Sequence, residues 1–117
     1  MKLSIRSQQG DVVRLLLQGR VSQRELSNTE EPIGDLLGDS AYSNHMVVDM
    51  SDVASLDSSG VNWLLVCQKR VRENSGTFVL HSLSPIATNV VKVLNLQTVF
   101  TLAADESEAL RFLEGGD

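Results

Sequence analysis

The sequence has few of the features that mark secreted or membrane proteins. Its 117 residues include a single cysteine, Cys67, so no internal disulfide can form, and we expect a buried thiol in a reducing compartment. No apolar run approaches the roughly 20 residues that a membrane-spanning helix needs. Residues 1–6 alternate apolar and polar side chains, unlike the continuous apolar stretch of a secretory signal. We therefore expect a cytoplasmic protein that does not insert into a membrane.

Positive charge is also scarce. The chain carries 10 Lys and Arg against 15 Asp and Glu, which gives a formal net charge of −5. The one basic cluster, Lys69-Arg70-Val71-Arg72, falls late in an expected helix, where cations offset the negative end of the helix dipole. Helix geometry therefore accounts for this cluster, and the sequence predicts no nucleic-acid ligand.

Motifs for nucleotide binding, metal binding and catalysis are missing as well. Neither Gly-x-x-x-x-Gly-Lys-Ser/Thr nor Gly-x-Gly-x-x-Gly occurs, which leaves only weak nucleotide binding open, and no residue spacing suits a metal. One catalytic alternative is a nucleophile, Ser58 or Ser59, with His45 or His81 as its base. The flanking residues do not form the Gly-x-Ser-x-Gly elbow of hydrolases. We expect neither an enzyme nor a cofactor.

The length is that of one ordinary domain, which we place at residues 1–114, followed by a flexible tail over residues 115–117. Apolar residues make up 42% of the chain and charged residues 21%, as in globular proteins. Leu3 and Ile5 alternate with polar neighbours, and the turn signal Gln9-Gly10-Asp11 separates them from the apolar run at residues 12–17. This pattern predicts a hairpin.

Helices and strands alternate after the hairpin. The compact apolar runs at residues 46–50 and 77–81 suit strands that are buried on both faces. Between them, residues 59–74 lack proline and repeat apolar side chains at helical spacing. A strand, a helix and a strand in that order form a right-handed parallel crossover. The sequence thus predicts an α/β fold with a mixed β-sheet, begun by the hairpin and covered by helices.

Two helices are expected between the hairpin and residue 40. Ser22 and Glu25 have capping-box spacing, and Pro32 would start a second short helix that ends near Gly38.

Three further elements are expected towards the end of the chain. Ser84 and Pro85 would cap and begin a helix that Asn95 ends in the left-handed conformation. Residues 99–102 read as a final strand, and Asp105 with Glu108 would start a last helix. We expect the first of these helices to turn an apolar stripe towards the core, formed by Ile86, Val90, Val93 and Leu94.

The most informative segment is Asp57-Ser58-Ser59-Gly60. We expect residues 51–56 to form a loop and the next helix to begin within this tetrapeptide. A helix start leaves N–H groups unpaired, so Asp57 or Ser58 can accept from them, and the dipole favours negative charge there. One capping residue would be enough, and functional groups of α/β folds gather at such strand-to-helix turns. A helix cap alone and a functional surface are equally compatible with these residues.

A whole-chain pattern surrounds this tetrapeptide. It comprises Gly19-Arg20-Val21, Met46-Val47-Val48-Asp49, the tetrapeptide itself, Val93-Leu94-Asn95-Leu96, Val99-Phe100 and the acidic start of the last helix at residues 105–110. In this order the chain resembles the STAS domains, named for sulfate transporters and anti-sigma factor antagonists, and especially the stand-alone bacterial antagonists. The tetrapeptide alone is common in turns, so its position between this strand and this helix makes the resemblance specific.

The resemblance implies a STAS-type fold and a partner-switching function. An unphosphorylated antagonist of this kind binds an anti-sigma factor that is also a serine kinase, and a sigma factor is released for transcription. Phosphorylation of the first motif serine, here Ser58, ends that binding by adding about −1.5 to −2 charge beside Asp57; a serine phosphatase is a further expected partner. The expected partner-binding residues are Asp57, Ser58, Ser59, Gly60, Asn62 and Trp63.

Two positions depart from the family pattern, and two alternatives stay open. Asn62 stands where the family commonly has a second glycine, and Ser22 where many antagonists have aspartate. Trp63 could anchor a partner or belong to the core. A different class of function keeps the fold without the phosphorylation switch, as a stand-alone STAS scaffold or a subunit of a transport assembly.

Overall fold

The computed structural model describes residues 1–26 and 41–114. A short helix, α1 (Gln23–Leu26), begins directly after Ser22, as the capping-box spacing predicts. The second helix expected from Pro32 to Gly38 and the expected tail at residues 115–117 lie outside the described residues.

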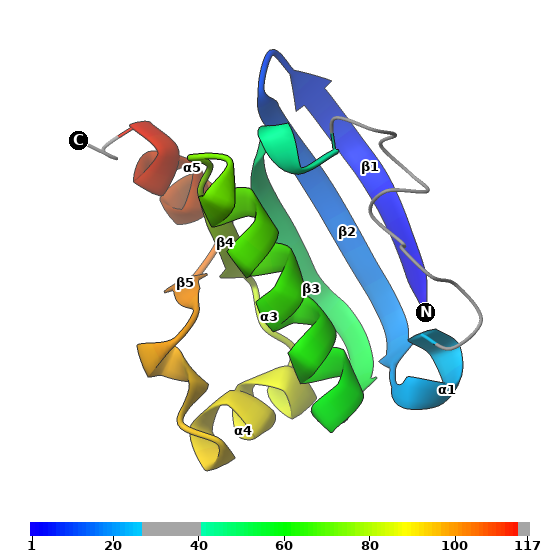
Figure 1. The fold of residues 1–117 in the computed structure, drawn as a ribbon. Helices are drawn as coiled ribbons and strands as arrows, with labels where there is room; N and C mark the ends of the chain where they lie inside the picture. The colour runs from blue at the N-terminus through cyan, green and yellow to red at the C-terminus, as the bar shows by residue number, and fades with distance from the viewer. Residues whose placement is uncertain (27–40, 115–117) are drawn as a thin grey trace.

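Five strands form one sheet in the order β1-β2-β3-β4-β5 (Figure 1). The predicted hairpin consists of β1 (Lys2–Gln9) and β2 (Val12–Val21), which pair antiparallel. Gly10 in its two-residue turn has φ +61°, and glycine at this first turn position lets the turn match the twist of the strands. β3 (His45–Leu56), β4 (Phe78–His81) and β5 (Thr101–Ala103) then pair parallel, with β3 beside β2. The predicted mixed sheet is confirmed.

Helices cover both faces of this sheet. α3 (Ser58–Glu73) and α4 (Pro85–Val93) pack on one face, and α5 (Glu106–Glu114) packs on the other. Two short 3₁₀ helices, η1 (Ala41–Ser43) and η2 (Leu96–Thr98), lie before β3 and before β5. A helix that connects two parallel strands runs from the carboxyl end of one strand back to the amino end of the next. The start of each such helix therefore lies near the carboxyl end of a strand.

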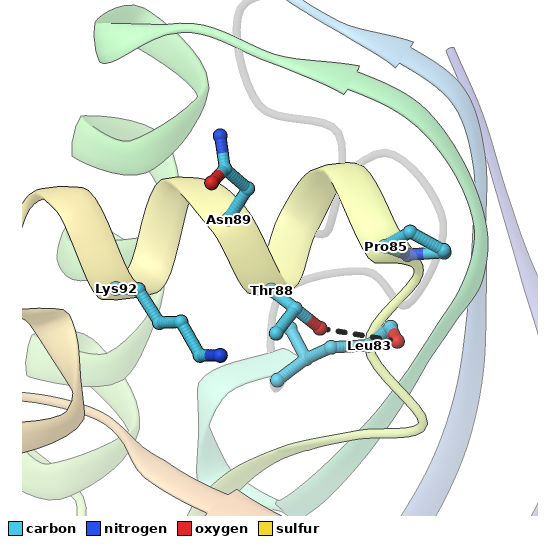
Figure 2. A pocket seen from close by; sticks show the side chains of 5 residues that line it. All are labelled: Leu83, Pro85, Thr88, Asn89 and Lys92. Atoms are coloured by element: carbon cyan, nitrogen blue, oxygen red, sulfur yellow. Dashed lines mark hydrogen bonds between the residues drawn. The ribbon is translucent and has the colours of Figure 1, made fainter.

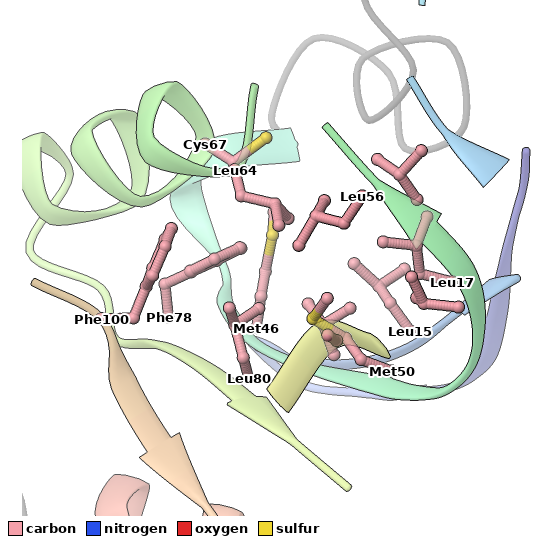
Figure 3. Packing of buried hydrophobic residues seen from close by; sticks show 14 of the residues in the cluster. Leu15, Leu17, Met46, Met50, Leu56, Leu64, Cys67, Phe78, Leu80 and Phe100 are labelled. Carbon is pink, nitrogen blue, oxygen red and sulfur yellow. The ribbon is translucent and has the colours of Figure 1, made fainter. Parts of the chain in front are cut away.

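The main core lies between the sheet and the two helices α3 and α4 (Figure 3). Cys67 is fully buried in it, as the sequence predicts. A smaller cluster on the other face joins Val47, Val79 and Ala103 to Ala109 of α5. Successive residues of β3 therefore contact different cores, which explains why three apolar residues, Met46 to Val48, follow one another without alternation.

The loop expected at residues 51–56 is wrong, because β3 continues to Leu56. Its second half pairs with β2 as far as Val21, which lies opposite Leu56. The pairing changes register between Leu16 and Gln18 and again after Gly19, whose φ is +84°. Such irregularities shift the alternation of inward and outward side chains, so the sequence shows no strand period there.

The apolar stripe expected to face the core from α4 is wrong in three of its four residues, whereas Val90 is half-buried and packs against the main core as predicted. Ile86 is 48% exposed, Val93 72% and Leu94 51%, whereas α4 buries Ala87 and Val91. The helix is one position, about 100°, away from the expected orientation.

The cap of α4 explains this orientation. The Ser84 N–H donates to the Met50 carbonyl at 3.1 Å, and the Ser84 hydroxyl donates to the Val53 carbonyl at 2.8 Å. These two bonds fix the start of the helix against β3, and the small side chain of Ala87 lets it approach closely.

Other local predictions near the C-terminus are confirmed. Ser84 caps α4 through the Ala87 N–H, and Asn95 has the left-handed conformation with φ +55°. The Asp105 side chain accepts a hydrogen bond from the Glu108 N–H at 2.9 Å at the start of α5. The last strand begins two residues later than expected, at Thr101, because Phe100 turns into the main core instead of pairing.

Candidate functional site

The tetrapeptide Asp57-Ser58-Ser59-Gly60 joins the end of β3 to the start of α3. It therefore lies at the carboxyl edge of the parallel strands, where functional groups of α/β proteins gather.

The Asp57 carboxylate caps two helices at once. Its Oδ1 accepts a hydrogen bond from the Gly60 N–H at 2.9 Å, and its Oδ2 accepts one from the Gln23 N–H at 3.0 Å. These two bonds, from Gly60 first and from Gln23, hold the pKa of the Asp57 carboxyl below its ordinary value. The exposed side chain is thus ionised at neutral pH and ties the start of α1 to the start of α3.

Gly60 allows α3 to begin in contact with the end of β2. A Cβ atom at this position would lie 2.4 Å from the Val21 carbonyl oxygen and 2.8 Å from a Leu56 methyl group. The same carbonyl of Val21 accepts a hydrogen bond from the Asp57 N–H at 3.3 Å. Close packing therefore explains the glycine, and it explains why the segment Gly19-Arg20-Val21 precedes the tetrapeptide in the pattern.

The two serines of the tetrapeptide differ in their exposure to solvent. Ser58 is the first residue of α3 and is exposed, whereas Ser59 is half-buried. Since Asp57 supplies the side-chain cap and Gly60 the close contact, the hydroxyl of Ser58 is presented to solvent at the positive end of the α3 dipole. Negative charge is favoured at such a position, so a phosphate there is compatible with the helix.

Along α3, an exposed row continues from Ser58. Asn62 and Val66 follow at spacings of four residues and are both exposed, Val66 to 37%. Trp63 is half-buried and packs against the main core, with its indole N–H buried and unpartnered among the residues that the structure describes. Trp63 thus contacts the core. Asn62 is an exposed polar side chain on the same side of α3 as Ser58.

A family model described as "Mlab, STAS domain" matches residues 5–103 of the chain. The chain belongs to the STAS domain family. The match covers the tetrapeptide, the strands β2 to β5 and most of β1, so the family predicted from the sequence is confirmed.

Solved structures share the fold of this STAS domain. A crystal structure of a candidate anti-sigma factor antagonist from Thermotoga maritima is 23% identical, with 86% of each chain covered and a TM-score of 0.74. An anti-sigma factor antagonist from Mycobacterium paratuberculosis is 21% identical, with 94% of this chain and 92% of that chain covered and a TM-score of 0.73. The antagonist SpoIIAA in its unphosphorylated form is 19% identical over 97% of both chains, with a TM-score of 0.72.

Both histidines of the STAS domain have structural partners away from the tetrapeptide. His45 begins β3, at the opposite end of the strand from Ser58, and its Nδ1 accepts from the Thr77 N–H at 3.0 Å. His81 is buried beside Ser82, with 2.8 Å between its Nδ1 and the hydroxyl oxygen, and burial lowers its pKa. The structure does not bring a histidine to Ser58 or Ser59, so the catalytic alternative has no geometric basis.

The exposed side of α4 is a surface that the sequence prediction missed. A groove lined by Leu83, Pro85, Thr88, Asn89 and Lys92 runs along the helix (Figure 2). The exposed Ile86 and Val93 lie on the same helix. Lys92 is the only charged residue between positions 82 and 104. This charge-poor stretch is the sequence signal for an apolar surface, since surface segments normally carry more charge.

Within residues 1–26 and 41–114, no group of three or more His, Cys, Asp and Glu side chains is placed to hold a metal ion. No helix in that part of the chain is long and apolar enough to span a membrane.

Proposed function

We propose that this STAS domain is an anti-sigma factor antagonist controlled by phosphorylation. Unmodified Ser58 permits binding to an anti-sigma factor with serine kinase activity, which then releases its sigma factor for transcription. The observation that carries the proposal is the exposure of Ser58 at the start of α3, beside an Asp57 that caps two helices and a Gly60 that packs against β2. The names of the three structures above support it, because each is an anti-sigma factor antagonist or a candidate for one.

The physical basis of the switch is charge. A phosphate on Ser58 adds about −1.5 to −2 charge next to the ionised Asp57 carboxylate. At a surface that docks closely against a partner, this charge causes repulsion and a desolvation cost. The start of α3 stabilises the phosphate, so the modification blocks docking without unfolding the domain. In this proposal the domain is the substrate of the kinase, a serine phosphatase restores binding, and the domain itself is not an enzyme.

Paired substitutions at Ser58 test the switch. Binding of the purified anti-sigma factor kinase by calorimetry is expected to be unchanged in Ser58→Ala and at least about tenfold weaker in Ser58→Asp, the loss that about 1.4 kcal/mol of repulsion produces. Ser107→Asp is the matched control, because Ser107 is an exposed serine in the first turn of another helix, α5. Equal affinities for the parent and both Ser58 variants would contradict the proposal.

Phosphate mapping tests which serine is modified. Incubation with the kinase and ATP is expected to label Ser58 and not the half-buried Ser59. Labelling that persists in Ser58→Ala would move the switch to another residue.

The α4 surface favours a second candidate function, a docking subunit or scaffold without a phosphorylation switch. Val93 and Ile86 present apolar area that has no partner in the described part of the chain. If this surface carries the binding, Val93→Asp abolishes partner affinity and Ser58→Asp leaves it unchanged. The reverse result supports the phosphorylation switch.

A further inference from the structure

The hydrogen bond between Asp57 and Gln23 links two helices, α3 and α1, that differ in length and in their contacts with the core. α3 has 16 residues and is anchored in the main core. α1 has four residues, Gln23–Leu26, and isolated helices shorter than roughly 12 residues are marginal in water. The start of α1 therefore depends on contacts such as the one from Gln23 N to Asp57 Oδ2, at 3.0 Å.

A phosphate on Ser58 acts on this carboxylate from the adjacent residue. Its oxygens are strong acceptors, and the phosphate is attached to the first residue of α3. It can therefore take over the N–H groups at the start of α3 that Asp57 now caps. The same phosphate repels the carboxylate, which is exposed and has solvent beside it to turn into. The Gln23 N–H donates to this same carboxylate, so it loses its acceptor when the carboxylate turns towards solvent.

We propose that α1 is the second half of the switch. Phosphorylation of Ser58 withdraws the Asp57 carboxylate from the Gln23 N–H and releases the start of α1 from α3. The binding surface then changes at the starts of both α1 and α3. We therefore expect the partner to be a protein that contacts both helices. This inference rests on the proposed modification of Ser58 and describes its consequence inside the domain.

The backbone amide of Gln23 gives a direct measurement that needs no partner protein. Phosphoserine can be placed at position 58 of the full chain during translation, and the amide can be followed by NMR. In the unmodified protein, the Gln23 amide shift is expected to titrate with the Asp57 carboxyl. In the phosphorylated protein, this titration is lost and the amide exchanges with solvent up to about tenfold faster, the effect of losing one hydrogen bond. Asp57→Ala gives the reference for a fully released amide.

Ser107 provides a matched control for the charge itself. The Asp105 side chain caps α5 through the Glu108 N–H, as Asp57 caps α3, but among the described residues it caps no second helix. Phosphoserine at position 107 is expected to leave the Gln23 amide unchanged. Unchanged amides in the main core, such as that of Val48, show in both proteins that the fold is intact.

The outcomes separate this inference from the proposed function. If the Gln23 amide keeps its titration and its exchange rate when Ser58 is phosphorylated, the release of α1 is wrong, even where partner binding is lost. If the amide is released and the partner still binds with unchanged affinity, the release of α1 stands and the binding switch is wrong.

Discussion

The Val21 carbonyl oxygen lies where a side chain at position 60 would begin, because a Cβ on Gly60 would be 2.4 Å from it. Real Cβ atoms do not approach a backbone oxygen so closely, so any substitution must displace either α3 or the end of β2.

Gly60→Ala is therefore expected to destabilise the domain by about 1–3 kcal/mol, the usual cost of overpacking a site that cannot relax. Urea unfolding measures this free energy. Asn62→Ala, two positions away and exposed, is the control and should change stability by less than about 0.5 kcal/mol. Equal stability of the two variants would show that the helix start is not in close contact with β2.

Because Val91 is buried and Val93 is exposed, replacing each by alanine is expected to change the stability of the domain by different amounts. Val91 is 6% exposed and packs in the main core, whereas Val93 is 72% exposed. Val91→Ala is expected to cost about 1–3 kcal/mol, because it leaves a cavity. Val93→Ala is expected to change the free energy of unfolding by less than about 0.5 kcal/mol. Thermal or urea unfolding of the pair decides which side of α4 faces the core.

The stability of the domain is expected to fall in acid partly through Asp49. Although burial raises the pKa of its carboxyl, the Ser51 N–H at 2.9 Å and the Arg6 guanidinium at 2.7 Å outweigh burial and hold the pKa below the ordinary 3.8. A carboxyl whose pKa is lower in the folded state stabilises the protein above its unfolded pKa, and this contribution is lost as the pH falls through the folded value.

The matching variant is Asp49→Asn, which removes the titrating group. Urea unfolding between about pH 6 and pH 2 should show a smaller loss of stability on acidification in this variant than in the parent. An equal acid response in both proteins would mean that Asp49 does not contribute to the pH dependence.

Ser58→Asp is expected to keep the fold, which the binding experiment requires. Aspartate in the first turn of a helix interacts favourably with the dipole, by about 0.3–1 kcal/mol. The melting temperature of Ser58→Asp should thus equal or slightly exceed that of the parent, while Ser58→Lys should melt lower. A marked loss of stability in Ser58→Asp would mean that weaker binding could come from unfolding.

Features that depend on neighbouring residues could be predicted from the sequence. The glycine of the hairpin turn, the Ser84-Pro85 start of α4 and the pair Asp105 and Glu108 each specify a local conformation, and the structure has all three. The parallel crossover follows from the order of strand, helix and strand.

Features that depend on distant residues could not be predicted. The second half of β3 pairs with β2 through two register changes, so its residues show no strand period. The orientation of α4 depends on hydrogen bonds from Ser84 to Met50 and Val53. In the site, the sequence indicated that Asp57 could act as a cap, but its bond to Gln23 joins residues 34 positions apart.

The Val21 carbonyl has a consequence for how Ser58 can be recognised. It accepts from the Asp57 N–H and lies against Gly60, so a strand far earlier in the chain sets the geometry around the serine. A synthetic peptide that spans the tetrapeptide and the first turns of α3 lacks this strand, the α1 start and the core beneath the helix. An enzyme that reads the folded shape around Ser58 would then find a poor substrate in the peptide and a good one only in the whole domain.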